Sequence, residues 1–271
     1  MADGTRDPED DLEGGKMPLL DHLLELRRRL MVSVLAFFAC FILGYTLAEP
    51  IFTFLVQPLA DITAGQQGRR MIYTALHEAF FTYIKVGFFF AACVSFPVVS
   101  GQLWLFIAPG LYKNERRAIL PFLFATPVLF ALGAAMVYYI VVPLAWQFFL
   151  GFEHPGGNGD LPLVLEPKVD QYLSLVMRLI FAFGVAFELP VLIVLLATVG
   201  IVSVEGLRSK RRYMIVAAFV VAAVLTPPDV ISQVLLAVPI IVLYELAILC
   251  SVMIERKRAR EAAEAEGPAG K

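Results

Sequence analysis

The chain has 271 residues, of which 59% are hydrophobic and only 17% are charged, and its formal net charge is −2. A water-soluble domain of this length carries roughly a quarter charged residues. This composition therefore excludes an ordinary soluble enzyme or binding domain, and it gives no reason to expect a nucleic-acid partner.

Six long apolar runs dominate the chain. A run of about 18 or more apolar residues can cross a bilayer as one helix. The runs are Leu30–Ala48, Val86–Ile107, Ala118–Leu150, Leu179–Val202, Tyr213–Thr226 and Val230–Ile254. The sequence thus predicts an all-α integral membrane protein, with one six-span domain over residues 18–254. The polar ends, residues 1–17 and 255–271, are expected to be largely disordered.

Before the first run, Pro18–Leu30 predicts an amphipathic helix lying on the membrane surface. Glu25 and Arg29 are spaced i,i+4 in it, so an ordinary helical ion pair is enough to explain this glutamate from the residues alone.

The loops Glu49–His77 and Gly151–Asp170 are long and rich in proline, including Pro58. Proline breaks regular structure. We therefore expect these two loops to form a cap of short segments on the side of the membrane opposite the termini.

The third and fifth runs depart from ordinary length. Ala118–Leu150 is too short for two spans of about 20 residues plus a turn, which favours one long, kinked helix. Tyr213–Thr226 would be only about 21 Å long, whereas a hydrocarbon core is about 30 Å thick. The fifth helix must therefore thin the bilayer or be shielded by its neighbours.

Positive charge alternates between the loops and sets the orientation. One side carries Arg27, Arg28, Arg29, Lys113, Arg116, Arg117, Arg208, Lys210, Arg211, Arg212, Arg256, Lys257, Arg258 and Arg260. The opposite loops hold only Arg69, Arg70 and Lys168. Cytoplasmic loops carry the excess of Lys and Arg, so both termini are predicted to be cytoplasmic.

Glu188 is the most unusual polar residue, because it lies within the fourth apolar run, two residues before Pro190. A charge at the bilayer centre costs about 2.5–3.5 kcal/mol on insertion scales, and such residues are usually functional. A structural hydrogen bond between helices is the alternative. Lys85 and Arg178, toward the ends of two spans, are expected to snorkel to the interface.

Other polar residues have simple structural explanations. Asn114 could cap the third span with Glu115 in its first turn, although capping does not explain Phe106 at the same membrane edge. Asp229 could be the N-cap of the sixth span, with Gln233 facing inward one turn later. The scattered cysteines and histidines show no metal-ligand spacing, and we find no catalytic arrangement or phosphate-binding loop. No enzyme activity and no cofactor are therefore expected.

Four strings in fixed order carry a resemblance to a known family. They are His22-Leu23-Leu24-Glu25-Leu26-Arg27, Phe106-Ile107-Ala108-Pro109-Gly110-Leu111-Tyr112-Lys113-Asn114-Glu115-Arg116-Arg117, Phe183-Gly184-Val185-Ala186-Phe187-Glu188-Leu189-Pro190 and Leu225-Thr226-Pro227-Pro228-Asp229-Val230-Ile231-Ser232-Gln233. With them the chain resembles TatC, the largest subunit of the twin-arginine protein translocase, from about Pro18 to Arg258.

The resemblance implies a curved, glove-like wall of six helices in the bacterial cytoplasmic membrane, with short fifth and sixth helices. It also implies a receptor that binds twin-arginine signal peptides of folded cargo. Its partners would be the single-span proteins TatB and TatA, with several copies in one receptor complex, and transport would be driven by the proton-motive force.

By the same resemblance, Glu25 and Glu115 would bind the two guanidinium groups, with Phe106 and Arg27 in the same patch. Glu188 would lie within the concave face. Pro58, Asp229 and Gln233 match far-side positions implicated in translocation or partner contact. The competing hypothesis is a proton-coupled transporter of a small solute with Glu188 as proton carrier, but the internal repeat typical of many such transporters is not evident.

Overall fold

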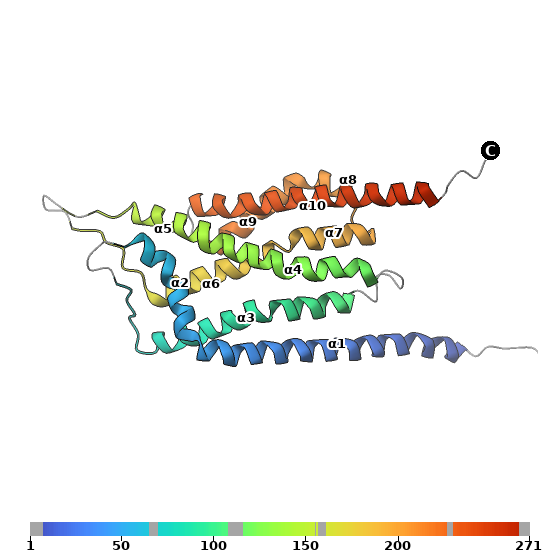
Figure 1. Ribbon diagram of the computed structural model, residues 1–271, viewed down its shortest axis with the longest axis horizontal. Helices are drawn as coiled ribbons and strands as arrows, with labels where there is room; N and C mark the ends of the chain where they lie inside the picture. Colours follow the sequence, from blue (N-terminus) through green and yellow to red (C-terminus); the bar gives the residue numbers. More distant parts are fainter. Residues whose placement is uncertain are drawn as a thin grey trace, which may run out of the picture.

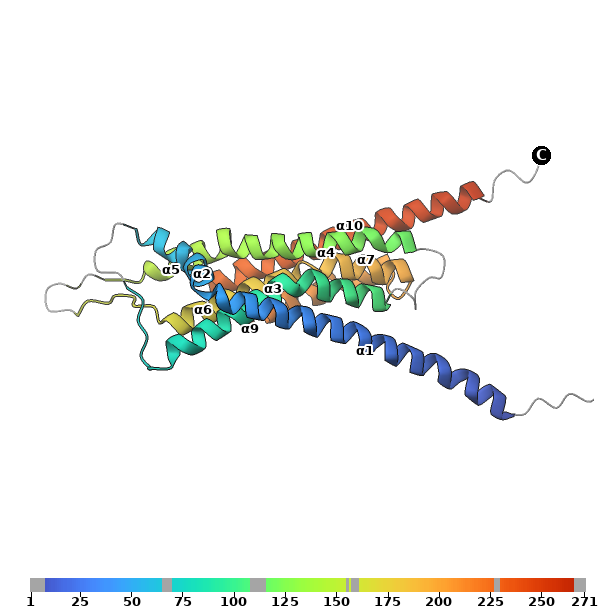
Figure 2. The same ribbon diagram turned by 60° about the horizontal axis from the view of Figure 1, so that its bottom comes forward.

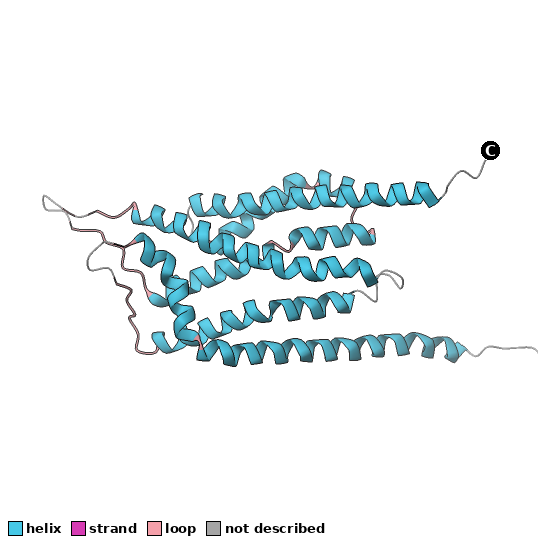
Figure 3. Ribbon diagram, in the orientation of Figure 1, coloured by secondary structure: helices cyan, strands magenta, loops and turns pink. Residues whose placement is uncertain are grey.

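The computed structural model describes residues 8–64, 70–107, 116–154, 156, 161–226 and 230–265. Within these ranges the regular elements are all helices (Figure 3), and β-pairing is limited to two isolated bridges, Ile72–Lys168 and His154–Leu163. The predicted all-α fold is confirmed.

The chain passes back and forth along one axis (Figure 1). Its first half comprises α1 (Pro8–Thr46), α2 (Ala48–Ile62), α3 (Glu78–Ile107), α4 (Arg116–Met136), the π-helix η2 (Val137–Val141) and α5 (Val142–Leu150). Its second half comprises α6 (Val169–Ala186), α7 (Leu189–Val199), α8 (Val204–Ser209), α9 (Arg211–Leu225) and α10 (Val230–Ala265).

The start of α1 and the end of α10 lie at the same end of the bundle, which we call the termini end (Figure 1). The opposite end, crossed by α2, is the cap end. Five helical segments of the described chain are long and apolar enough to cross a membrane. The sixth crossing, α9, has 15 residues, or about 22 Å. The short fifth span that the sequence predicts is therefore present.

The prediction of a separate surface helix over Pro18–Leu30 is wrong. These residues belong to α1, a single helix of 39 residues. No glycine or proline lies between Pro18 and Gly44, so nothing in the sequence ends the helix before the membrane. Figure 2 shows α1 leaving the rest of the bundle toward the termini end. Most side chains of residues 20–30 are exposed.

The third run forms one continuous helical path, as predicted. Its α-helical geometry changes to a π-helix at η2 and resumes in α5, where Pro143 occupies the first turn. A π-bulge and a proline are both recognised causes of a bend in a helix. The helical path therefore continues through both features without ending.

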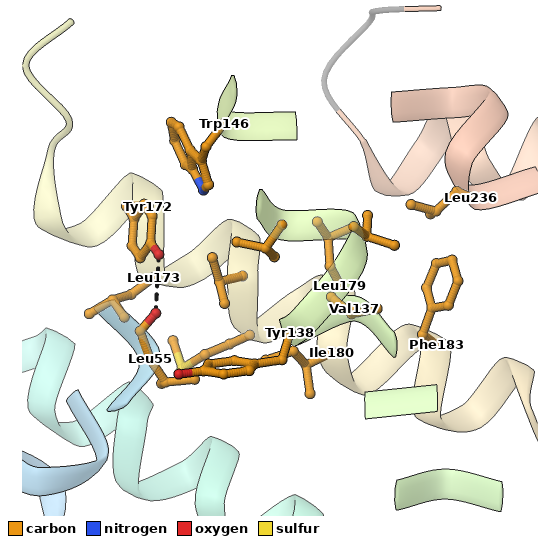
Figure 4. Packing of buried hydrophobic residues seen from close by; sticks show 14 of the residues in the cluster. Leu55, Val137, Tyr138, Trp146, Tyr172, Leu173, Leu179, Ile180, Phe183 and Leu236 are labelled. Carbon is orange, nitrogen blue, oxygen red and sulfur yellow. Dashed lines mark hydrogen bonds between the residues drawn. The ribbon is translucent and has the colours of Figure 1, made fainter. Parts of the chain in front are cut away.

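The cap differs from the expected short pieces. Residues 48–62 form one helix, α2, with Pro58 inside it. It runs across the cap end of the bundle (Figure 1). The buried core lies below it and is built largely on α6, which contributes Leu173, Leu179, Ile180 and Phe183 (Figure 4).

Candidate functional site

At the termini end, α1 contacts the end of α3 one helical turn from Glu25, a predicted site residue. His22 lies one turn before Glu25 on α1, and its ring stacks on that of Phe106, with 4.3 Å between centroids and 20° between the planes. Phe106 is the next-to-last residue of α3 and is half-buried. An apolar, aromatic surface therefore lies next to the turn of α1 that carries the carboxylate.

The Glu25 carboxylate is only partly engaged within the protein. Arg29 donates to it from Nε at 3.0 Å and also from Nη2, which is the ion pair that the i,i+4 spacing predicts. Both bonds end on Oε1. Oε2 accepts no hydrogen bond from the residues that the structure describes, and the side chain is 34% exposed. The glutamate can therefore hold Arg29 and still accept a second cation.

The other two residues expected in this patch are less defined. Arg27 is exposed and forms no ion pair within the described ranges. Glu115 lies outside the described residues, as do all of residues 108–115. Arg27 follows Glu25 by two residues, so it lies on a different face of α1. The described part of the patch thus offers a carboxylate and an aromatic stack at the boundary between apolar helix and water. A guanidinium group is the ligand that a carboxylate binds best, by charge-assisted and often bidentate hydrogen bonds.

Glu188 occupies the break between α6 and α7 rather than the middle of a continuous helix. Both carboxylate oxygens are buried, and neither makes a hydrogen bond of normal geometry within the described ranges. The groups that approach it are the Thr126 hydroxyl and the backbone of Phe130, both on α4. Thr126 in turn accepts a hydrogen bond from Trp104 Nε1 at 3.0 Å, so its own hydroxyl proton is available to the glutamate.

This geometry predicts how substitutions at Glu188 rank. Glutamine keeps the shape and an acceptor for Thr126, so we expect Glu188→Gln to leave thermal stability nearly unchanged. Alanine leaves a cavity where the buried side chain was, which destabilises the protein, and lysine would bury an unpaired cation at still greater cost. Melting temperatures of the purified variants measure the order. A Gln variant as unstable as the Lys variant would contradict it.

Pro58, on α2, affects a hydrogen bond that the helix would otherwise make. In an α-helix the amide at position i donates to the carbonyl at i−4, and proline has no amide proton. Pro58 therefore frees the Phe54 carbonyl. The Tyr138 hydroxyl, from η2, donates to that oxygen at 2.7 Å, and its ring stacks on Phe54 with 4.3 Å between centroids.

A second tyrosine reinforces this attachment. Tyr172 on α6 donates from its hydroxyl to the Leu55 carbonyl at 3.1 Å (Figure 4). Two hydrogen bonds to adjacent carbonyls therefore attach the cap helix to the bundle. The Tyr138 hydroxyl replaces the hydrogen-bond donor that Pro58 lacks.

We expect Tyr138→Phe to destabilise the protein by about 1–3 kcal/mol, because it leaves a carbonyl without a partner. In a Pro58→Ala background the restored amide proton can donate to the Phe54 carbonyl. Tyr138→Phe should therefore reduce the free energy of unfolding by less in that background. Thermal unfolding of the four proteins in a double-mutant cycle measures the coupling. If the losses of stability from the two substitutions were additive, Tyr138 would not be the donor that replaces the Pro58 amide.

The remaining far-side residues are only partly placed. Gln233, in the first turn of α10, donates from Nε2 to the Phe219 carbonyl on α9 at 3.1 Å, so it does face inward and joins the last two spans. Asp229 lies outside the described residues. Lys85 pairs with Asp170 at the start of α6, which satisfies the cation within the protein.

Sequence reasoning did not single out His22, Tyr138 or Thr126. The stacking partner of His22 could not be predicted without the knowledge that α1 continues beyond the membrane edge as one helix. Part of the signal for Tyr138 was present, because a proline inside a helix leaves the carbonyl four residues earlier without its helical donor, but the sequence does not say which group takes that place.

Comparisons with known proteins agree with this architecture. Residues 21–239 match the family model described as Sec-independent protein translocase protein (TatC). A Sec-independent protein translocase protein TatC of Magnetococcus marinus is 55% identical over 250 residues, covering 92% of this chain and 89% of the relative. The corresponding protein of Escherichia coli K12 is 44% identical over 234 residues, covering 86% and 88%.

Solved structures give the same result. A crystal structure of the twin arginine translocase receptor TatC superposes with a TM-score of 0.73 at 37% identity, covering 86% of this chain and 98% of the other. A second crystal structure of that receptor, in the detergent DDM, also has a TM-score of 0.73, at 38% identity.

Proposed function

The chain belongs to the TatC family of Sec-independent protein translocase proteins, and from this premise we propose that it is the receptor subunit of a twin-arginine translocase. It binds twin-arginine signal peptides of folded proteins and takes part in their transport across the membrane. The observation that carries the proposal is the partly free Glu25 carboxylate one turn from the His22–Phe106 stack.

The proposed recognition follows from the chemistry of that patch. One guanidinium of the peptide would bind Oε2 of Glu25, and the apolar residues near it would pack on Phe106. Glu115 would take the second guanidinium, and Arg27 would favour backbone carbonyl oxygens or acidic side chains of the ligand. An electrostatic contact of this kind at a membrane boundary is stronger than in bulk water, because the local dielectric constant is lower.

We further propose that the termini end faces the cytoplasm of a bacterial cell and that the protein lies in the cytoplasmic membrane. The support is the distribution of Lys and Arg, which favours the termini end. The partners would be single-span TatA-like and TatB-like proteins, with several copies of this chain in one receptor complex. Pro58, Asp229 and Gln233 would contribute to partner contact or translocation on the far side.

Replacement of the native gene tests the function as a whole. In a bacterium that lacks its own TatC, this chain should restore export of a folded reporter that carries a twin-arginine signal, and a twin-lysine signal should not be exported. Restored uptake of a small solute without export of the reporter would favour the proton-coupled transporter instead. Glu188→Gln should retain export. If Glu188 were a proton carrier, this variant would lose transport, because glutamine cannot release and take up a proton.

A further inference from the structure

Arg178 is a cation inside a membrane-crossing segment, and nothing in the described part of the chain neutralises it. It lies nine residues after Val169, the first residue of α6, or about 13.5 Å along the helix. Its side chain is exposed, and it forms no ion pair or hydrogen bond within the described ranges. Lys85 solves the same problem with Asp170, so Arg178 differs from it in needing an anion from outside the protein.

The residue lies at one end of an apolar groove between α6 and α9. The groove has a volume of about 420 Å³, and Phe181, Ala182, Ala217 and Leu225 are among its lining residues. Arg178 precedes Phe181 by three residues and Ala182 by four, so it shares their face of α6 one turn closer to the cap end. The helical spacing therefore places the cation one turn beyond the groove, on the same face of α6.

The last residue of the short α9 borders the same groove. Helices α6 and α9 run in opposite directions, and Leu225, the last residue of α9, lines the groove together with Phe181. A span of 15 residues is about 22 Å long, which is less than the roughly 30 Å of hydrocarbon. A bilayer can thin beside such a helix, so we expect the lipid headgroups at the cap end to lie closer to Arg178 than they would beside a full-length span.

The side chain also points in the right direction. Side chains on a helix tilt toward its N-terminus, and the N-terminus of α6 is at the cap end. Arginine snorkels toward an interface while its methylene groups stay in lipid. The guanidinium therefore extends from the rim of the groove toward the lowered headgroups.

We propose that Arg178 and the α6–α9 groove form a phospholipid site. The guanidinium binds the phosphate of a lipid in the leaflet at the cap end, and an acyl chain of that lipid lies along the groove. Charge complementarity selects the occupant, because the planar guanidinium matches phosphate oxygens in a bidentate arrangement and the groove below it is apolar. The site is separate from the peptide patch and does not depend on the proposed function.

Native mass spectrometry of the purified full-length protein, loaded with phosphatidylglycerol and then stripped in steps with detergent, tests the site. We expect Arg178→Gln to lower the retention of bound lipid by roughly tenfold, the loss of one charge-assisted contact. Arg178→Lys should be intermediate, because it keeps the charge but not the fork. Arg208→Gln, an exposed cation on α8, is the matched control and should retain lipid like the parent protein.

A groove variant separates the phosphate contact from the acyl-chain contact. Ala217→Phe fills the groove without touching the charge, and it should also lower retention. Equal lipid retention by Arg178→Gln and the parent protein would overturn the proposal. Loss of a co-purifying single-span partner from Arg178→Gln, with lipid retention unchanged, would overturn it in favour of a partner helix that carries a carboxylate.

Discussion

Glu25→Gln is expected to weaken binding of a twin-arginine signal peptide by about ten- to a hundredfold. Glutamine keeps the shape of the side chain but removes its charge, and a hydrogen bond to a charged group contributes about 1.5–3 kcal/mol, where 1.4 kcal/mol is tenfold in affinity. Binding of a fluorescent signal peptide to the purified protein in lipid nanodiscs measures the change. Glu115→Gln should give a loss of similar size.

The internal ion pair supplies the sharpest control for this result. If Glu25 served only to pair with Arg29, then Arg29→Gln would damage the protein in the same way. In our account Arg29→Gln instead frees Oε1, and peptide affinity should be unchanged or higher. Glu49→Gln, which alters an exposed carboxylate in the first turn of α2, should have no effect. Equal losses from Glu25→Gln and Arg29→Gln would show that the helix, and not the carboxylate, matters.

Gly133→Ala is expected to destabilise the protein by about 1–3 kcal/mol or more, because α4 and α6 approach closely there. A Cβ at this position would lie 2.6 Å from the Phe183 carbonyl oxygen and 2.9 Å from the Phe187 ring. The obstacle is partly backbone, so relief requires the helices to separate. The melting temperature of the purified variant measures the cost.

The same substitution should also disturb Glu188, which follows Phe187 directly at the break between α6 and α7. Gly101→Ala is the matched control, because its Cβ would meet only a methyl group of Leu123 at 3.3 Å, which a flexible side chain can move away. We expect its melting temperature to stay close to that of the parent protein. Equal melting temperatures for the two variants would contradict the close approach of α4 and α6.

The sequence predicts the number, order and relative length of the spans, because apolar runs directly report burial in lipid. It places the starts of two helices too late. α3 begins at Glu78 and α6 at Val169, well before the apolar runs at Val86 and Leu179. In each of these helices a cation, Lys85 or Arg178, directly precedes the apolar run. The cation limits the apolar run but does not interrupt the helix.

Two contacts between distant parts of the chain, in the cap and in the site, cannot be predicted from local sequence patterns. A proline inside a loop suggests a break, but Pro58 lies within α2, and Tyr138, eighty residues away, donates to the carbonyl that this proline leaves free. The pair of Glu25 and Arg29 was evident from spacing alone. The stack of His22 on Phe106 was not, because it joins two helices whose relative placement depends on tertiary packing.

Site-specific photocrosslinking tests the central claim most directly. A photoreactive amino acid at position 25 or 115, in cells that express a twin-arginine precursor, should form crosslinks to the signal peptide. The yield should fall sharply when both arginines of the signal are replaced, and less when they are changed to lysine. Crosslinks of equal yield with and without the arginines, or none from either position, would contradict a site in which acidic side chains read paired guanidinium groups.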